Sequence, residues 1–383
     1  MLRRFKPILM YVLIALLSCL VTTCALYDGE HYSKLTELEQ VIDAYFVDPV
    51  DSAAIEDAAA EAMVEALGDR WSHYMTQEEF LAYREKMRNA YVGVGITVQA
   101  WEDGYIHLVR VEAGGPAEEA GLLPGDTLTA VDGQNIFQLD IDTVKDMVRG
   151  ESGTQVQLTV QRDGQTLDFT VERRTVQTVV VKSQMLPGDV GLVTIVNFDD
   201  RCARETLSAV DALRLQGAKA LIFDVRYNPG GYKHELVAIL DYLLPEGVLF
   251  RSVDYAGKES IDESNAACVE LPMAVLINGD SYSAAEFFAA ALSEYGVAKL
   301  VGEPTTGKGH FQSTYMLSDG SAVTISVGKY CTPNGVSLDG VGLTPDIPVE
   351  VDDELYMNIY YGYVEPKDDP QIQAALNLFN PEK

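Results

Sequence analysis

Apolar residues recur every three or four positions through much of residues 28–90, a spacing typical of amphipathic helices. One helix is expected over residues 58–67, and Gly68 directly after it is the residue type that most often ends a helix. Thr76 and Glu79 have the spacing of a capping box, which predicts the start of a further helix. We therefore expect residues 28–90 to form a helical accessory region.

At Tyr91 the pattern changes to an alternation of apolar and polar residues, which is typical of half-buried strands. Pairs of turn-forming residues repeatedly interrupt this alternation. These pairs include Asp103-Gly104, Pro124-Gly125, Asp132-Gly133 and Asp163-Gly164. The pattern predicts a compact β-rich module over residues 91–175.

Beyond this module, strand-like and helix-like segments alternate, which predicts an α/β core over residues 176–350. The strand-like segments are 190–196, 220–225 and 273–277, and the helix-like segments are 204–216 and 284–295. Residues 351–383 are acidic and rich in tyrosine, and we expect them to form a C-terminal tail. The fold class that follows is a multidomain α/β (α+β) chain.

The N-terminus has a basic flank, Met1-Leu-Arg-Arg-Phe-Lys, followed by the uncharged apolar residues 7–26. A run of this length is sufficient to cross a bilayer, and the basic flank favours a cytoplasmic N-terminus. Residues 1–27 are therefore predicted to be an uncleaved, single-pass membrane anchor that places the rest of the chain outside the cytoplasm. A cleaved signal peptide or a lipid anchor at Cys19 is the alternative, and it exports the chain as well.

The charge of the chain argues against a nucleic-acid partner. It has 58 acidic and 28 basic residues in 383, a formal net charge of −30, and this field repels phosphate backbones. Its five cysteines include no CxxC pair, so no zinc framework is predicted, and we expect no metal or other cofactor. Cys202, Cys268 and Cys331 are interpreted as buried thiols, with one disulfide among them as the alternative.

A glycine-rich segment, Val92-Gly93-Val94-Gly95-Ile96, opens the β-rich module. Glycines let successive backbone N–H groups converge on an anion, and the strand that follows can accept a peptide as an added strand. Together with residues 114–126, whose sequence ends in Ala-Gly-Leu-Leu-Pro-Gly-Asp, and a helix expected over 140–148, the segment resembles a PDZ domain. A dinucleotide site is excluded because the glycines lead into a strand and not into a helix.

Three motifs lie in the predicted α/β core. They are Asp224-Val-Arg-Tyr-Asn-Pro-Gly-Gly231, Asn278-Gly-Asp-Ser-Tyr-Ser-Ala-Ala-Glu286 and Gly302-Glu-Pro-Thr-Thr-Gly-Lys-Gly-His-Phe-Gln312. In this order the sequence resembles the C-terminal processing peptidases, or tail-specific proteases, which are Ser/Lys peptidases with an embedded PDZ domain. The resemblance extends over residues 35–351, including Leu67-Gly-Asp-Arg-Trp-Ser-His-Tyr74.

The resemblance implies that Ser283 is the nucleophile, Lys308 its general base and Gln312 the residue that orients the lysine. Serine needs such a base, and a free lysine with a pKa of about 10.4 is almost wholly charged at neutral pH. Lowering this pKa to about 7 costs about 4 kcal/mol, which burial without a carboxylate partner can supply. None of the residues beside Lys308 in the sequence is acidic.

The position of Ser283, between a strand and an Ala-rich helix, favours an oxyanion site at the helix N-terminus. The family resemblance implies that the N–H of Ala284 and one from Gly230 or Gly231 form this site, and we favour Gly230. It also implies that Arg149 signals peptide occupancy, although an arginine at a helix end is commonly only a favourable charge.

Two residues depart from the family pattern beside the expected site: Tyr227, where a small polar residue is usual, and Tyr282 between the two serines. Both are expected to narrow the cleft or alter its specificity. Ser281 is the competing nucleophile, and we interpret it as a turn residue.

Other classes of enzyme fit less well. Residues 302–308 satisfy most of a P-loop, but Gly309 stands where Ser or Thr must hold magnesium. A Ser-His-Asp hydrolase would need His234 or His310, and no G-x-S-x-G elbow occurs.

The prediction is a serine endopeptidase that cleaves C-terminal tails of extracytoplasmic proteins. Its expected partners are polypeptides with accessible C-termini, the membrane, and an adaptor or a second copy of the chain. The alternative is a non-catalytic PDZ scaffold that binds exported C-termini.

Overall fold

The computed structural model describes residues 33–101, 103–112, 114–265 and 267–379, and the chain divides into two units after Ala66. The described part of the first unit consists of helices α2 (Ser33–Tyr45) and α3 (Ser52–Glu65). The predicted membrane anchor lies outside the described residues. Within the described ranges, no helix is both long and apolar enough to cross a membrane.

The second unit begins with a short strand and a helix. The capping box of Thr76 and Glu79 is present and starts helix α4 (Gln77–Met87), as predicted. Strand β1 (His73–Met75) was not predicted, and it pairs with β18 (Ala322–Cys331), about 250 residues later. The region expected to be helical therefore contributes a strand to a sheet of the α/β core.

The predicted β-rich module is a six-stranded sheet with two helices. Its strands follow the order β3-β4-β5-β7-β8, with β6 beside β5, so β3 is an end strand with β4 as its neighbour. The elements are β3 (Ile96–Ala100), β4 (Ile106–Val111), α5 (Pro116–Ala120), β5 (Thr127–Val131), β6 (Gln134–Asn135), α6 (Ile141–Val148), β7 (Gln155–Arg162) and β8 (Gln165–Glu172). The alternation that predicted these strands buries Leu108, Leu128 and Leu158 in one core. Strands β2 (Ala90–Gly93) and β9 (Arg174–Gln177) pair where the chain enters and leaves the module.

A six-stranded sheet forms the centre of the α/β core, with strand order β10-β11-β12-β15-β16-β19. All neighbouring pairs are parallel except β10 with β11. The strands are β10 (Val181–Leu186), β11 (Val190–Ile195), β12 (Ala220–Asp224), β15 (Met273–Ile277), β16 (Ala298–Gly302) and β19 (Ile347–Pro348). Strands β12 and β15 are buried along their full length, as expected for parallel strands covered on both faces.

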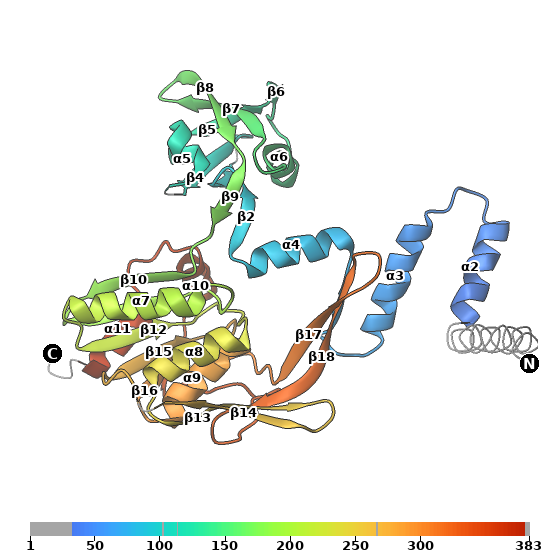
Figure 1. Ribbon diagram of the computed structural model, residues 1–383. Helices are drawn as coiled ribbons and strands as arrows, with labels where there is room; N and C mark the ends of the chain where they lie inside the picture. Colours follow the sequence, from blue (N-terminus) through green and yellow to red (C-terminus); the bar gives the residue numbers. More distant parts are fainter. Residues whose placement is uncertain (1–32, 102, 113, 266, 380–383) are drawn as a thin grey trace, which may run out of the picture. The chain divides into compact units, whose positions relative to one another are not determined.

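Helices cover both faces of this sheet (Figure 1). Side chains of α7 (Cys202–Leu215), α8 (Lys233–Leu243) and α9 (Ala284–Glu294) share one apolar core with residues such as Phe223. On the other face, α11 (Pro370–Phe379) packs Ile372, Ala375 and Leu376 against the sheet. Cys202, Cys268 and Cys331 are free cysteines; Cys202 is buried, as interpreted, whereas Cys268 and Cys331 are only partly buried.

A second, antiparallel sheet follows the order β1-β18-β13-β14, and β17 also pairs with β18. Its remaining strands are β13 (Gly247–Asp254), β14 (Glu259–Ser264) and β17 (His310–Met316). This sheet carries Gln312 and Tyr330, two residues that line the cleft described below.

The C-terminal segment was expected to be a tail, but it is built into the core. Arg226 is buried and its guanidinium donates to Asp224 at 2.7 and 2.9 Å, to Gln371 at 2.8 Å and lies 2.9 Å from Asp369. These contacts join the end of β12 to the start of α11. No local sequence pattern indicates this role, because Arg226 and Gln371 are 145 residues apart.

Candidate active site

Four loops that follow adjacent parallel strands carry the polar residues of one cleft. Asp199 follows β11, Gly230 follows β12, Ser283 follows β15 and Lys308 follows β16. In open α/β sheets the crevice beyond the carboxyl ends of the strands is the usual ligand site. The cleft has a volume of about 870 Å³, a size that accommodates a short stretch of peptide.

Ser283 occupies a strained turn at the start of α9. Its φ of 59° and ψ of −124° lie outside the regions that side-chain-bearing residues favour. The strain is compensated by surrounding hydrogen bonds, since its N–H donates to Glu286 Oε2 at 3.0 Å. The residue is 7% exposed, so its hydroxyl is accessible only from the cleft that it lines.

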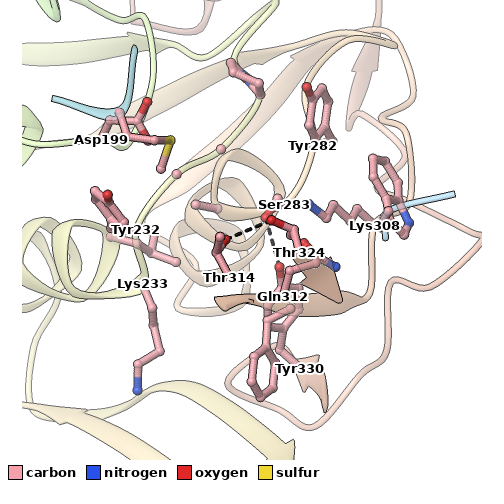
Figure 2. A pocket seen from close by; sticks show the side chains of 18 of the residues that line it. Asp199, Tyr232, Lys233, Tyr282, Ser283, Lys308, Gln312, Thr314, Thr324 and Tyr330 are labelled. Carbon is pink, nitrogen blue, oxygen red and sulfur yellow. Dashed lines mark hydrogen bonds between the residues drawn. The ribbon is translucent and has the colours of Figure 1, made fainter. Parts of the chain in front are cut away.

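The hydroxyl of Ser283 is hydrogen-bonded to the hydroxyl of Tyr330, with 2.9 Å between the two oxygens (Figure 2). Burial raises the pKa of Tyr330 to about 12, so its hydroxyl stays neutral at physiological pH. Sequence reasoning did not identify this contact, because Tyr330 lies 47 residues from Ser283 on a strand of the other sheet.

Lys308 lies in the same cleft, and Figure 2 shows its side chain directed toward Ser283. Its Nζ is 4.5 Å from the ring centre of Trp71 and 5.9 Å from that of Tyr282. Burial lowers the pKa of Lys308 to about 8, and Asp69 and Glu286 oppose this shift. The Trp71 ring also favours the charged form, because its face attracts cations. Among the described residues, no hydrogen bond joins Lys308 Nζ to Ser283 or to Gln312.

Gln312 lies at an irregularity of the β17–β18 pairing and also lines the cleft. Its side-chain amide donates to His310 O at 3.1 Å and to Ser326 Oγ at 3.0 Å. These two contacts fix the amide at the cleft wall. The role in orienting Lys308 stays a prediction.

Glu286 joins the loops of Ser283 and Lys308 from a fully buried position. Its carboxylate accepts from the N–H groups of Ser283 at 3.0 Å, Gly307 at 2.7 Å and Lys308 at 2.9 Å, and from the Thr305 hydroxyl at 2.5 Å. Burial raises its pKa, and these four donors oppose that effect. Sequence analysis assigned it no role, although the Ser-x-x-Glu spacing from Ser283 is that of a capping box.

The three residues predicted to supply oxyanion donors all line the cleft with Ser283, but their N–H groups are not equivalent. Gly230 N–H donates to Asn228 Oδ1 at 2.8 Å, whereas the described residues offer Gly231 N–H and Ala284 N–H no acceptor. The conformation therefore favours Gly231 over Gly230 as the second donor. Gly230 must lack a side chain for a steric reason, because a Cβ there would lie 2.7 Å from Ser283 Cβ and 2.9 Å from Ala284 N.

The two tyrosines that depart from the family pattern have different positions. Tyr282 lines the cleft, as expected. Tyr227 instead donates its hydroxyl to Tyr356 O at 2.7 Å and packs against Tyr356 and Tyr360 of α10 (Asp353–Tyr360). Of these two tyrosines only Tyr282 lines the cleft, and its effect on cleft width or specificity stays a prediction.

The competing residues lack the required contacts. Ser281 Oγ donates to Val225 O at 2.8 Å and is fully buried, as a turn residue would be. His234 is largely exposed, and His310 faces Asp339 at 3.2 Å. No described residue supplies a histidine partner to Ser283 Oγ.

Trp71 is a second cleft residue that sequence analysis quoted without a role. It comes from the segment before α4, its ring is tilted against that of Tyr282 with 5.7 Å between ring centres, and it contacts Lys308 Nζ. Sequence analysis could not identify this contact, because Trp71 and Lys308 are far apart in the sequence.

In the β-rich module, the glycine-rich segment leads from β2 into the end strand β3, so that Ile96 begins a strand with a free edge in the described sheet. Gly95 has a φ of +80°, which explains the glycine. Val94 is buried, and Val92 and Gly93 pair with β9. Arg149 is mostly exposed and its nearest carboxylate partner is Asp146, at 3.8 Å. The role of these residues in peptide binding stays a prediction.

The fold and the site together define a serine peptidase with an inserted PDZ domain. Residues 189–349 match peptidase family S41, residues 107–162 match the PDZ domain, and the chain belongs to peptidase family S41. It is 32% identical over 325 residues to the carboxy-terminal processing protease CtpA of Bacillus subtilis, covering 84% of this chain and 70% of that protein.

A solved structure is also similar. The photosystem II D1 C-terminal processing protease superimposes with a TM-score of 0.50 at 27% identity, covering 85% of this chain and 88% of the other. The chain is therefore a C-terminal processing serine protease, as the sequence resemblance indicated.

Proposed function

We propose that the protein hydrolyses peptide bonds near the C-termini of polypeptides by a Ser/Lys mechanism, with Ser283 as nucleophile and Lys308 as general base. The observation that carries this proposal is a lysine with a pKa of about 8, directed at a strained serine in one cleft. A base with a pKa near the working pH combines a sizeable neutral fraction with useful basicity.

In the first half of the reaction, neutral Lys308 takes the hydroxyl proton of Ser283 as Oγ attacks the scissile carbonyl carbon. The N–H groups of Ala284 and Gly231 stabilise the oxyanion that forms, with help from the α9 dipole. Collapse expels the amine, which receives the proton from the Lys308 ammonium. The products are the released C-terminal peptide and an acyl ester on Ser283.

In the second half, water gives a proton to Lys308 and attacks the ester carbonyl. The second tetrahedral intermediate then expels Ser283 Oγ, which regains the proton from Lys308. Either hydroxyl can donate in the hydrogen bond between Ser283 and Tyr330, and when Tyr330 Oη is the donor, Ser283 keeps its own proton to donate to Lys308.

The remaining residues have supporting roles in this proposal. Glu286 positions the loops of Ser283 and Lys308, and Gln312 orients the lysine once it approaches the serine. The PDZ domain captures the substrate tail on the free edge of β3, with the loop around Gly93 and Gly95 receiving the terminal carboxylate. Arg149 reports peptide occupancy to the catalytic core.

The proposed division of the chain is an anchor over 1–27, a helical region over 28–90, a PDZ domain over 91–175, a protease core over 176–350 and a C-terminal segment over 351–383. We propose that the anchor holds the catalytic part outside the cytoplasm. An adaptor or a second copy of the chain is a further proposed partner.

The test uses the purified protein and an unstructured peptide with a free C-terminus. We expect cleavage by the wild type, and a loss of roughly 1000-fold or more in both Ser283→Ala and Lys308→Ala. Lys233→Ala is the matched control, because Lys233 lines the same cleft but is paired with Asp262 at 2.8 Å. Cleavage that persists in both active-site variants would contradict the mechanism.

A PDZ deletion tests whether the domain selects substrates, and the full-length protein tests the alternative of a scaffold with no catalytic function. If the domain only selects substrates, the deletion variant still cleaves short peptides but loses its preference for long tails. A full-length protein that binds tail peptides tightly and cleaves none would support the scaffold.

A further inference from the structure

A buried carboxyl group on the cleft wall has no role in the reaction described above. Asp199 is 5% exposed, lines the cleft, and its Oδ1 has no hydrogen-bond partner among the described residues. Buried polar atoms of this kind are rare, and each one requires an explanation. In Figure 2, Asp199 and Tyr232 lie on one side of Ser283 and Lys308 lies on the other.

The backbone places Asp199 next to the proposed oxyanion donors. Phe198 forms a parallel bridge with Gly231, with Phe198 N–H donating to Gly230 O and Tyr232 N–H donating to Phe198 O, both at 2.7 Å. A Cβ on Gly231 would lie 2.7 Å from Asp199 N. Asp199 therefore adjoins the Gly230-Gly231 turn and lines the same cleft as Ser283.

Several titratable groups surround Asp199, and none of them forms an ion pair with it in the described structure. Lys86 and Tyr83 face it from α4, Cys202 from α7, Glu235 from α8, and Asp200 and Tyr232 from the neighbouring loops. Lys86 is exposed to water, and Glu235 accepts instead from Ala203 N–H at 2.5 Å. Burial raises the pKa of Asp199 to about 7; the charge of Lys86 opposes this shift, whereas Asp200 and Glu235 add to it.

We propose that Asp199 is a specificity-determining residue, whose carboxylate binds a basic side chain of the substrate within three residues of the scissile bond. A bound peptide displaces water from the cleft, which leaves the carboxylate without partners unless the peptide supplies a cation. An arginine or lysine side chain supplies both the charge and the N–H donors. This inference rests on the proposed peptidase function and concerns the same cleft.

The acidic residues Asp200 and Glu235 lie close to His234 and resemble a cation site in composition. His234 is largely exposed, and these residues are not invoked in the proposal. A metal ion bound there is nevertheless a rival source of positive charge for Asp199, and the test includes it.

The experiment measures kcat/KM for a set of peptides that differ at one position. A neutral parent peptide is compared with peptides carrying one arginine, or one norleucine of similar length, at each of the three positions on either side of the scissile bond. We expect arginine at one of these positions to raise kcat/KM about 10-fold over norleucine. In Asp199→Asn this ratio falls to within about twofold, while cleavage of the neutral parent changes little.

Asp200→Asn is the matched control, because Asp200 is half-buried and directly follows Asp199 in the same turn. This variant retains the Asp199 carboxylate, so we expect it to keep the preference for arginine. In the wild type, the arginine-to-norleucine ratio should also rise with pH, with a midpoint at or below about 7, since the carboxyl group must ionise. The titration of Lys308 affects kcat/KM for both peptides equally, so it cancels in this ratio.

No arginine preference, or one that Asp199→Asn leaves intact, would overturn the inference. A preference that disappears on adding EDTA to the wild type would overturn it too, in favour of a bound metal. If the neutral parent is not cleaved at all, the proposed function fails, so the two failures are distinguishable.

Discussion

In the PDZ domain the chain is held by an apolar core, whereas the turns around Ser283 are held by buried polar contacts. Leu108, Leu128 and Leu158 are 0–1% exposed, and the glycine-rich segment lies at the border of that core. By contrast, Glu286 alone accepts four hydrogen bonds from the loops that carry Ser283 and Lys308. Apolar packing tolerates small shifts, but a hydrogen-bonded site loses its geometry when one member is removed.

A methyl group added at Gly230 tests this comparison with the largest expected effect. Gly230→Ala places a Cβ 2.7 Å from Ser283 Cβ at a φ of +88°, and we expect kcat/KM to fall roughly 1000-fold. Gly335→Ala is the control, because Gly335 has a φ of +82° and nothing within 4 Å of the added Cβ. Equal losses in the two variants would show that backbone strain alone is responsible.

The same substitution in the PDZ domain should act differently. Gly95 has a φ of +80° and its added Cβ meets neighbours at 3.5 Å or more. We expect Gly95→Ala to lower the affinity for a tail peptide while cleavage of a short peptide is unchanged. The measurement is peptide binding by fluorescence anisotropy beside kcat/KM on the short substrate.

Removal of a buried arginine should lower the free energy of unfolding by about 3 to 5 kcal/mol, because it leaves carboxylates buried without their partner. Arg226→Ala removes the partner of Asp224 and Asp369, both of which are themselves buried. Arg149→Ala is the control and should cost less than about 1 kcal/mol, since its ion pair is exposed. Urea unfolding of both variants measures the difference, and similar costs would contradict the account.

The loss of the Glu286 charge should lower kcat/KM about 100-fold, because an amide cannot accept from all four donors. Glu294→Gln, on the same helix but outside the cleft, should change kcat/KM less than twofold. If Glu286→Gln keeps full activity, the carboxylate does not position the catalytic loops.

The smallest effect is expected at Tyr227, which packs behind the catalytic turn. Tyr227→Phe removes one hydrogen bond, to Tyr356 O, and should cost about 1 kcal/mol of stability with kcat/KM unchanged. A change in substrate preference would mean that Tyr227 acts on the cleft after all.

Much of the α/β core and of the catalytic cleft could be predicted from the sequence. The segments 190–196, 220–225 and 273–277 have the mainly apolar character of buried parallel strands, and the last two lead into motifs of the cleft. The pairing of Ser283 with Lys308 came from the family resemblance, and the structure explains it, because strands β15 and β16, which precede the two residues, are parallel neighbours whose carboxyl ends meet at one edge.

What could not be predicted depends on contacts between residues far apart in the sequence. Tyr330 reaches Ser283 from the second sheet, and Gln371 reaches Arg226 across 145 residues. Neither has a local pattern, since a tyrosine in a strand and a glutamine in a helix are ordinary residues. Asp199 was missed for another reason: its unusual property is the lack of a partner, which depends on burial.

The central claim is that Lys308 removes the proton from Ser283, and the most direct measurement is the pH dependence of Ser283 acylation by a fluorophosphonate. We predict one adduct per chain, at Ser283 by mass spectrometry, with a labelling rate that rises with pH around a midpoint of about 8. In Lys308→Arg, whose side chain stays charged, labelling should be at least about 100-fold slower. A labelling rate that does not change with pH, or wild-type labelling of Lys308→Arg, would contradict the claim.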